Sequence, residues 1–80
     1  MRIVKELNVE TFKVTVYFWN NKYILKYENG WHEITYKISQ LDINSESDID
    51  VFISDPEIIQ KVKESFDKVN ETMAAFYNKI

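Results

Sequence analysis

Residues 12–38, FKVTVYFWNNKYILKYENGWHEITYKI, decide the fold of this chain. Apolar and polar side chains alternate along the stretch, and two short breaks, Asn20-Asn21 and Asn29-Gly30, interrupt the alternation. Alternation with a period of two is typical of a half-buried strand. Asn-Gly between two such runs is a strong hairpin signal, because a type I′ turn needs positive φ at both central residues. The stretch therefore predicts three antiparallel strands joined by two tight turns.

Two-residue turns would also fix the register of the strands, with Trp19 facing Lys22 and Glu28 facing Trp31. One sheet face is then predicted to be the core, made of Phe12, Val14, Val16, Phe18, Tyr23, Leu25, Tyr27, His32, Ile34, Tyr36 and Ile38. The opposite face is mixed, with Lys13, Thr15, Tyr17, Trp19, Lys22, Ile24, Lys26, Glu28, Trp31, Glu33, Thr35 and Lys37.

A first strand over 2–8, with Ile3 and Leu7 on one face, would complete a four-stranded meander spanning 2–43. An acidic connector follows over 44–53, within a segment that holds no Lys or Arg. Its apolar residues fit either a strand or a short helix. The helix is slightly favoured, because serines there can cap it and acids in a first turn are stabilising.

The clearest helix covers 54–80. Ser54 and Glu57 have the spacing of a capping box, and Pro56 lies in the first turn, where its missing N–H costs nothing. One apolar stripe then runs along the helix with spacings of three and four, through Ile59, Val62, Phe66, Val69, Met73, Phe76 and Ile80. This pattern predicts a long amphipathic helix packed on one face of the sheet.

These elements predict a single α+β domain over 1–80. A helix of this length measures about 39 Å, whereas the diagonal of a four-stranded sheet is roughly 32 Å. The last turns of the helix should therefore project beyond the sheet, and exposed apolar surface of this kind commonly marks an interface. We expect a homodimer, with candidate contacts at Met73, Phe76, Tyr77 and Ile80.

Composition argues against several classes of function. The chain has no Cys and one His, so it offers no thiolate nucleophile and too few ligands for a zinc site. Aligned on Asp42, the acidic connector resembles a calcium loop but has Ser47 where Gly is needed and Ile53 where Glu is needed. We expect no enzyme activity, no cofactor and no metal.

A cysteine-free chain without a long apolar run is expected to be cytoplasmic, with no membrane association.

The best candidate binding surface is the outer sheet face, and the residues selected on it are Tyr17, Trp19, Lys22, Lys26, Trp31 and Lys37. A protein partner or a second copy of the chain could rest on these aromatics. Alternatively, the aromatics stack bases while the lysines follow a phosphate backbone. A third interpretation is an ordinary solvated sheet face. The net charge of −3 does not favour a polyanion partner.

The order of four strands followed by a long helix resembles that of the single-strand-binding Pur repeats, which pair through their helices. The resemblance is one of architecture and implies pairing through the C-terminal helix. The basic motifs of those proteins are missing, and no Arg follows Arg2. The sequence therefore predicts a small non-enzymatic protein-interaction module, with weak single-stranded nucleic-acid binding as the alternative.

Overall fold

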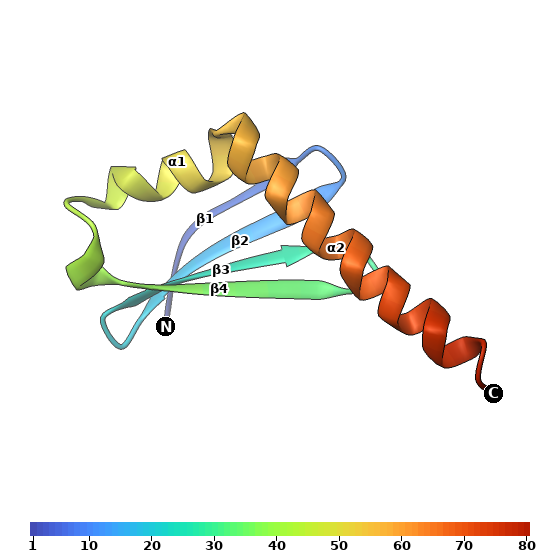
Figure 1. Ribbon diagram of the computed structural model, residues 1–80. Helices are drawn as coiled ribbons and strands as arrows, with labels where there is room; N and C mark the ends of the chain where they lie inside the picture. The colour runs from blue at the N-terminus through green and yellow to red at the C-terminus, as the bar shows by residue number, and fades with distance from the viewer.

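The computed structural model describes all 80 residues. The elements are β1 (Arg2–Val9), β2 (Phe12–Trp19), β3 (Lys22–Glu28), β4 (Glu33–Ser39), the 3₁₀ turns η1 (Gln40–Asp42) and η2 (Glu46–Asp48), and the helices α1 (Ile49–Ser54) and α2 (Pro56–Tyr77). The strands form one antiparallel sheet in the order β1-β2-β3-β4, and both helices lie over the same face of it (Figure 1). The predicted α+β architecture, a meander followed by a long helix, is confirmed.

The core lies between the two central strands and the helices. Its buried apolar residues are Phe12, Val14 and Val16 of β2, Tyr23, Leu25 and Tyr27 of β3, and Ile49, Ile53, Val62 and Phe66 of α1 and α2. All six strand residues belong to the face that the sequence predicts as core. The inward apolar side chains of the edge strands β1 and β4 are only half-buried. The helical layer thus covers the middle of the sheet and leaves both edges partly open.

The first tight turn forms as predicted. Asn20 and Asn21 have φ angles of 53° and 62°, the left-handed region that a type I′ turn requires at both positions. Trp19 lies opposite Lys22 in the ladder. Asparagine tolerates this region better than most residues, so the pair can replace Asn-Gly here.

The second turn differs from the prediction. The side-chain Oδ1 of Asn29 accepts hydrogen bonds from the backbone N–H groups of Trp31 (3.3 Å) and His32 (3.0 Å). These bonds form an Asx turn and close a four-residue connection, so Glu28 lies opposite Glu33 rather than opposite Trp31. The predicted register of β4 was wrong by two residues. Because two is the side-chain period of a strand, the faces of β4 are preserved.

A bulge in β1 also departs from the prediction. Ile3 pairs with Tyr17, whereas Lys5 pairs with Val16, so Val4 is an extra residue in the ladder. The bulge moves Ile3 to the outer face and turns Lys5 to the helix side. The expectation that Ile3 and Leu7 share a face was therefore wrong.

The connector is helical, which settles the alternative left open over 47–53. α1 ends at Ser54, and Asp55 then adopts an extended conformation with φ −72° and ψ 123°. The residue before a proline avoids helical geometry, so Pro56 separates the two helices. The predicted cap Ser54 was wrong: the Asp55 side chain accepts hydrogen bonds from the N–H groups of Glu57 and Ile58.

The long helix projects beyond the sheet, as Figure 1 shows at its C-terminal end. The molecule measures 46 × 26 × 21 Å, and its radius of gyration is 14.2 Å, against about 12 Å for a compact chain of this length. The helix ends at Tyr77, three residues before the predicted end at Ile80. Neither helix combines the length and apolar character that a membrane crossing requires.

Candidate functional site

The outer sheet face brings together five of the six residues predicted as a binding surface. Tyr17 and Lys37 flank Ile24 in one cross-strand row, and Trp19 faces Lys22 in the next row, beside the Asn20-Asn21 turn. Lys26 lies further along β3 on the same face. These five residues therefore form a surface that runs from the middle of the sheet to the β2–β3 turn.

Trp31 does not belong to this surface. It lies in the β3–β4 turn, at the far end of β3 from Trp19, and is 92% exposed. The seven residues of β3 separate the two ends of the sheet by roughly 20 Å. The Asx turn of Asn29 causes this change, because it lifts Trp31 and His32 out of the strand. A stacking platform that spans both tryptophans is therefore not present on one face.

Ion pairs neutralise part of the charge on the outer face. Lys13 lies 2.9 Å from Glu6, and Lys26 lies 3.6 Å from Glu28. The hydrogen bond that Lys13 donates to Glu6, together with the negative charge of that carboxylate, raises the pKa of Lys13. On this face, only Lys22 and Lys37 have no carboxylate partner within ion-pair distance.

At the β3–β4 end, the turn and the projecting helix enclose an open groove of about 540 Å³. Its lining residues are Trp31 and His32 of the turn and Asn70, Met73, Ala74 and Tyr77 of α2. Met73 belongs to the predicted helical stripe, and Tyr77 was predicted as a dimer contact from the overhang of the helix. The position of Trp31 beside this helix was not predicted. The signal for it in the sequence was Asn29, whose side chain can close an Asx turn.

The end of α2 supplies more apolar surface next to this groove. Phe76, Tyr77 and Ile80 are all exposed, Ile80 by 84%, and Met73 is half-buried. The rings of Phe76 and Tyr77 lie 5.3 Å apart, centroid to centroid. All four predicted dimer contacts therefore lie together at one end of the molecule.

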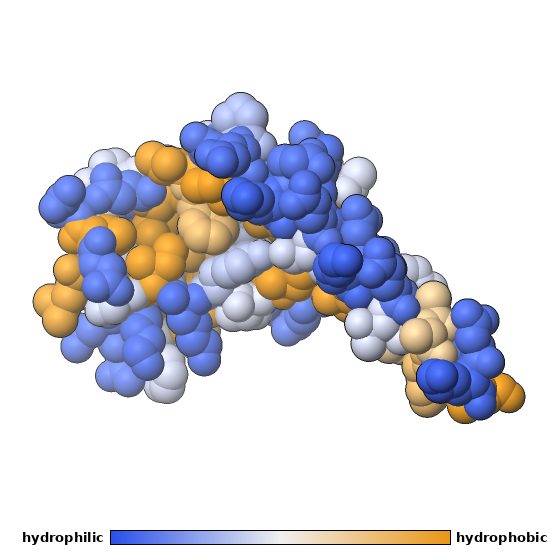
Figure 2. All heavy atoms as spheres, viewed as in Figure 1, coloured by the Kyte–Doolittle hydropathy of each residue, from blue (hydrophilic) through white to orange (hydrophobic).

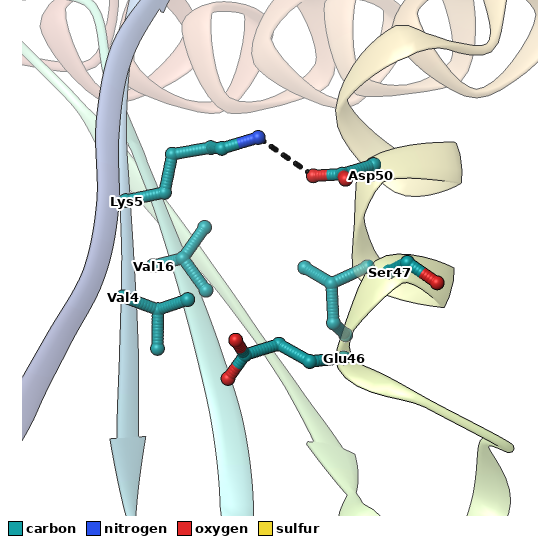
Figure 3. A pocket seen from close by; sticks show the side chains of 7 residues that line it. Val4, Lys5, Val16, Glu46, Ser47 and Asp50 are labelled. Carbon is teal, nitrogen blue, oxygen red and sulfur yellow. Dashed lines mark hydrogen bonds and ion pairs between the residues drawn. The ribbon is translucent and has the colours of Figure 1, made fainter.

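A second, smaller cleft of about 250 Å³ lies between β1 and the helical connector (Figure 3). The bulge at Val4 points Lys5 into this cleft, where its Nζ lies 2.7 Å from Asp50 Oδ1. At the same end of the sheet Arg2 donates to Glu46 at 3.1 Å, and the Tyr23 hydroxyl donates to the same carboxylate at 3.2 Å. Burial of the ring, together with this carboxylate, raises the pKa of Tyr23.

These contacts explain the uneven charge of the chain. Residues 1–40 carry six Lys or Arg and four Asp or Glu, a net charge of +2, and residues 41–80 carry four and nine, a net charge of −5. The basic first strand holds the acidic connector against the sheet through Lys5–Asp50 and Arg2–Glu46. The charged side chains of the cleft therefore form ion pairs within the chain.

Several polar side chains of the acidic connector serve local structure. Asp48 accepts hydrogen bonds from the N–H groups of Asn44 and Ser45, and the hydroxyls of Ser45 and Ser47 bond each other at 2.7 Å. No group of three or more His, Asp or Glu side chains is placed to hold a metal ion. The exposed apolar side chains that lie together are those at the projecting end of α2, with Trp31 beside them.

No protein-family model, no curated protein and no solved structure matches this chain.

Proposed function

We propose that this chain is a small, non-enzymatic protein-interaction module that forms a homodimer through the projecting end of α2. The observation that carries the proposal is the cluster of exposed apolar side chains at one end of the molecule, Trp31 on the turn and Phe76, Tyr77 and Ile80 on the helix. Aromatic residues and Met are the types enriched at protein interfaces. The cytoplasmic location expected from the cysteine-free sequence belongs to the same proposal.

The exposed area is sufficient for a dimer. At about 200 Å² for each of these large side chains, their exposed fractions amount to roughly 600 Å² on each copy. Two copies together would bury roughly 1,200 Å², the lower end of the range for specific interfaces. Polar residues around the patch add to this area.

The position of the patch also suits a second copy of the chain. The groove beside Trp31 and the helix end belong to one patch, since Met73 and Tyr77 line the groove and Phe76 and Ile80 continue the apolar stripe of the helix. In a two-fold dimer each copy makes the same contacts with the other, so each copy covers this patch on its partner and has its own patch covered in return.

Sedimentation velocity at micromolar concentrations tests the proposal. We expect the wild-type chain to sediment as a dimer and the variant Phe76→Ala with Ile80→Ala to dissociate at least about tenfold more readily, because each buried apolar side chain contributes about 1.5–3 kcal/mol. Glu64→Ala, an exposed position nearer the start of the same helix, is the matched control and should leave the dimer unchanged. A wild-type chain that stays monomeric would contradict the proposal.

A further inference from the structure

The free edge of β4 is unlike the free edge of β1. β1 carries a bulge at Val4 and an inward-pointing Lys5, and both devices discourage edge-to-edge pairing. β4 keeps a regular register from Glu33 to Ser39, without a bulge or a proline. A regular edge strand presents unpaired backbone N–H and C=O groups that another strand can use.

The apolar layer is also open on the β4 side. The inward residues Ile34, Tyr36 and Ile38 are only half-buried, and so is Phe52 of α1, whose ring lies 5.0 Å from that of Tyr36. Figure 2, viewed as Figure 1, shows apolar atoms at the surface between the α1 segment and the sheet. A strand added beside β4 would cover this opening.

The outward side chains of β4 carry unbalanced charge. Glu33 lies directly opposite Glu28, and like charges in this position are destabilising. Lys26 lies 3.6 Å from Glu28, whereas neither Glu33 nor Lys37 forms an ion pair within the chain. The free edge therefore offers one unpaired acid and one unpaired base, four residues apart.

We propose that the β4 strands of two copies pair antiparallel about a two-fold axis at Thr35, joining the two four-stranded sheets into one continuous sheet. This inference rests on the proposed homodimer and adds a second contact to it. In this register Glu33 of each copy lies opposite Lys37 of the other, and Thr35 lies opposite Thr35, a favourable cross-strand pair.

Side-chain direction and charge together select this register. When the two-fold axis passes through a residue, the residues that lie opposite each other point to the same face, so the apolar faces of both copies stay on the helix side. An axis between two residues would turn the apolar face of one copy to the other side of the sheet. An axis at Glu33 or at Lys37 would place like charges opposite each other. Among the remaining positions, only the axis at Thr35 places both charged residues directly opposite a partner of opposite sign.

The same register covers the other exposed apolar residue of this region. Leu41, in η1, is 93% exposed. The β4 strand of the second copy ends at Ser39, two residues beyond the Lys37 that lies opposite Glu33. The η1 turn of that copy, with Leu41, therefore follows on the side of the β3–β4 turn and of the groove that Met73 and Tyr77 line. The paired edges and the projecting helices are therefore compatible within one dimer.

A charge-swap experiment tests the proposed pairing. Lys37→Glu or Glu33→Lys places like charges across the edge, and we expect each to raise the dimer dissociation constant about tenfold or more. The double variant Glu33→Lys with Lys37→Glu restores opposite charges and should return the constant to within about threefold of wild type. Both substituted positions carry exposed side chains, so folding, followed by circular dichroism, should be unaffected in all three variants.

A cysteine cross-link gives an independent measurement, because the chain has no cysteine of its own. Residues on a two-fold axis between antiparallel strands have Cα atoms about 4.5–5.5 Å apart, within the range that a disulfide spans. Thr35→Cys should form a covalent dimer on mild oxidation. Thr11→Cys, in the exposed β1–β2 turn, is the control and should not.

The outcomes separate this inference from the proposed function. A wild-type dimer that is weakened by Phe76→Ala with Ile80→Ala but is unchanged by the charge variants and uncross-linked through Thr35→Cys would overturn the edge pairing alone. A dimer weakened by the charge variants and unaffected at the helix end would uphold the edge pairing and overturn the helix contact. A monomeric wild-type chain would overturn both.

Discussion

The rings of Phe12 and Phe66 stack with their centroids 4.8 Å apart and their planes inclined by 16°. Phe12 opens β2 and Phe66 lies in the middle of α2, so this contact fixes the point at which the long helix crosses the sheet. Both residues are buried. Ten residues further along the same helix, Phe76 makes no such contact with the sheet and is 52% exposed.

We therefore predict different results for the same substitution at two positions of one helix. Phe66→Ala should lower the free energy of unfolding by about 3–5 kcal/mol, because it removes a buried ring and leaves a cavity. Phe76→Ala should leave the unfolding of the monomer, measured with urea at low protein concentration, nearly unchanged. Comparable losses at both positions would show that Phe76 is packed against the domain.

Tyr27 is the most confined aromatic residue, with 1% of its surface exposed, and its hydroxyl has no hydrogen-bond partner. A buried unpaired hydroxyl costs free energy, so Tyr27→Phe should stabilise the fold by about 1 kcal/mol and raise Tm by about 4–8 °C. Tyr23→Phe is the matched control. It removes a hydrogen bond to Glu46 and should be neutral or slightly destabilising. A loss of stability in Tyr27→Phe would show that the hydroxyl does have a partner.

Stability should fall in the alkaline range. Burial raises the pKa of Tyr27 to about 12, against an ordinary value of about 10. Between these two values the unfolded chain has lost this proton while the folded chain keeps it, so the free energy of unfolding falls as pH rises. The raised pKa values of Tyr23 and Lys13 act in the same direction. Between pH 9 and about 12, the free energy of unfolding measured with urea should fall less steeply with pH for Tyr27→Phe than for wild type. Identical slopes would contradict the attribution of this fall to Tyr27.

The start of α2 allows a direct test of which residue caps it. Asp55→Ala removes the acceptor for the N–H groups of Glu57 and Ile58 and should cost about 1 kcal/mol. The Ser54 hydroxyl instead donates to the carbonyl oxygen of Asp50 within α1, so Ser54→Ala should change thermal stability much less. The reverse order of effects would restore Ser54 as the cap.

Much of this fold was predictable because period and turn chemistry are local. Alternation over 12–38 and the helical stripe after Pro56 predicted the sheet, its inner face and the long helix correctly. The error in the register of β4 came from a single residue with two local options. Asn29 can supply a type I′ turn or use its side chain to close an Asx turn, and the second option prevailed.

The bulge at Val4 could not be predicted from pattern alone. Its effect is to bring Lys5 within 2.7 Å of Asp50, a residue 45 positions away, and alternation within one strand contains no information about that partner. For the candidate site, the helix-end residues followed from the length of the helix. The position of Trp31 did not, because it depends on the Asn29 turn.

The two tryptophans now have different predicted roles. Trp31 lies beside the groove and the projecting helix, whereas Trp19 lies at the other end of the sheet, opposite Lys22. Trp31→Ala should weaken dimerisation about tenfold or more, since large aromatics dominate interface energies, and Trp19→Ala should not change it. Both residues are exposed, so each variant should fold like the wild type. Sedimentation velocity of the two variants side by side makes the comparison, with circular dichroism to check folding. If Trp19→Ala dissociates the dimer and Trp31→Ala does not, the interface lies on the outer sheet face, and both the helix contact and the edge pairing at Thr35 fail.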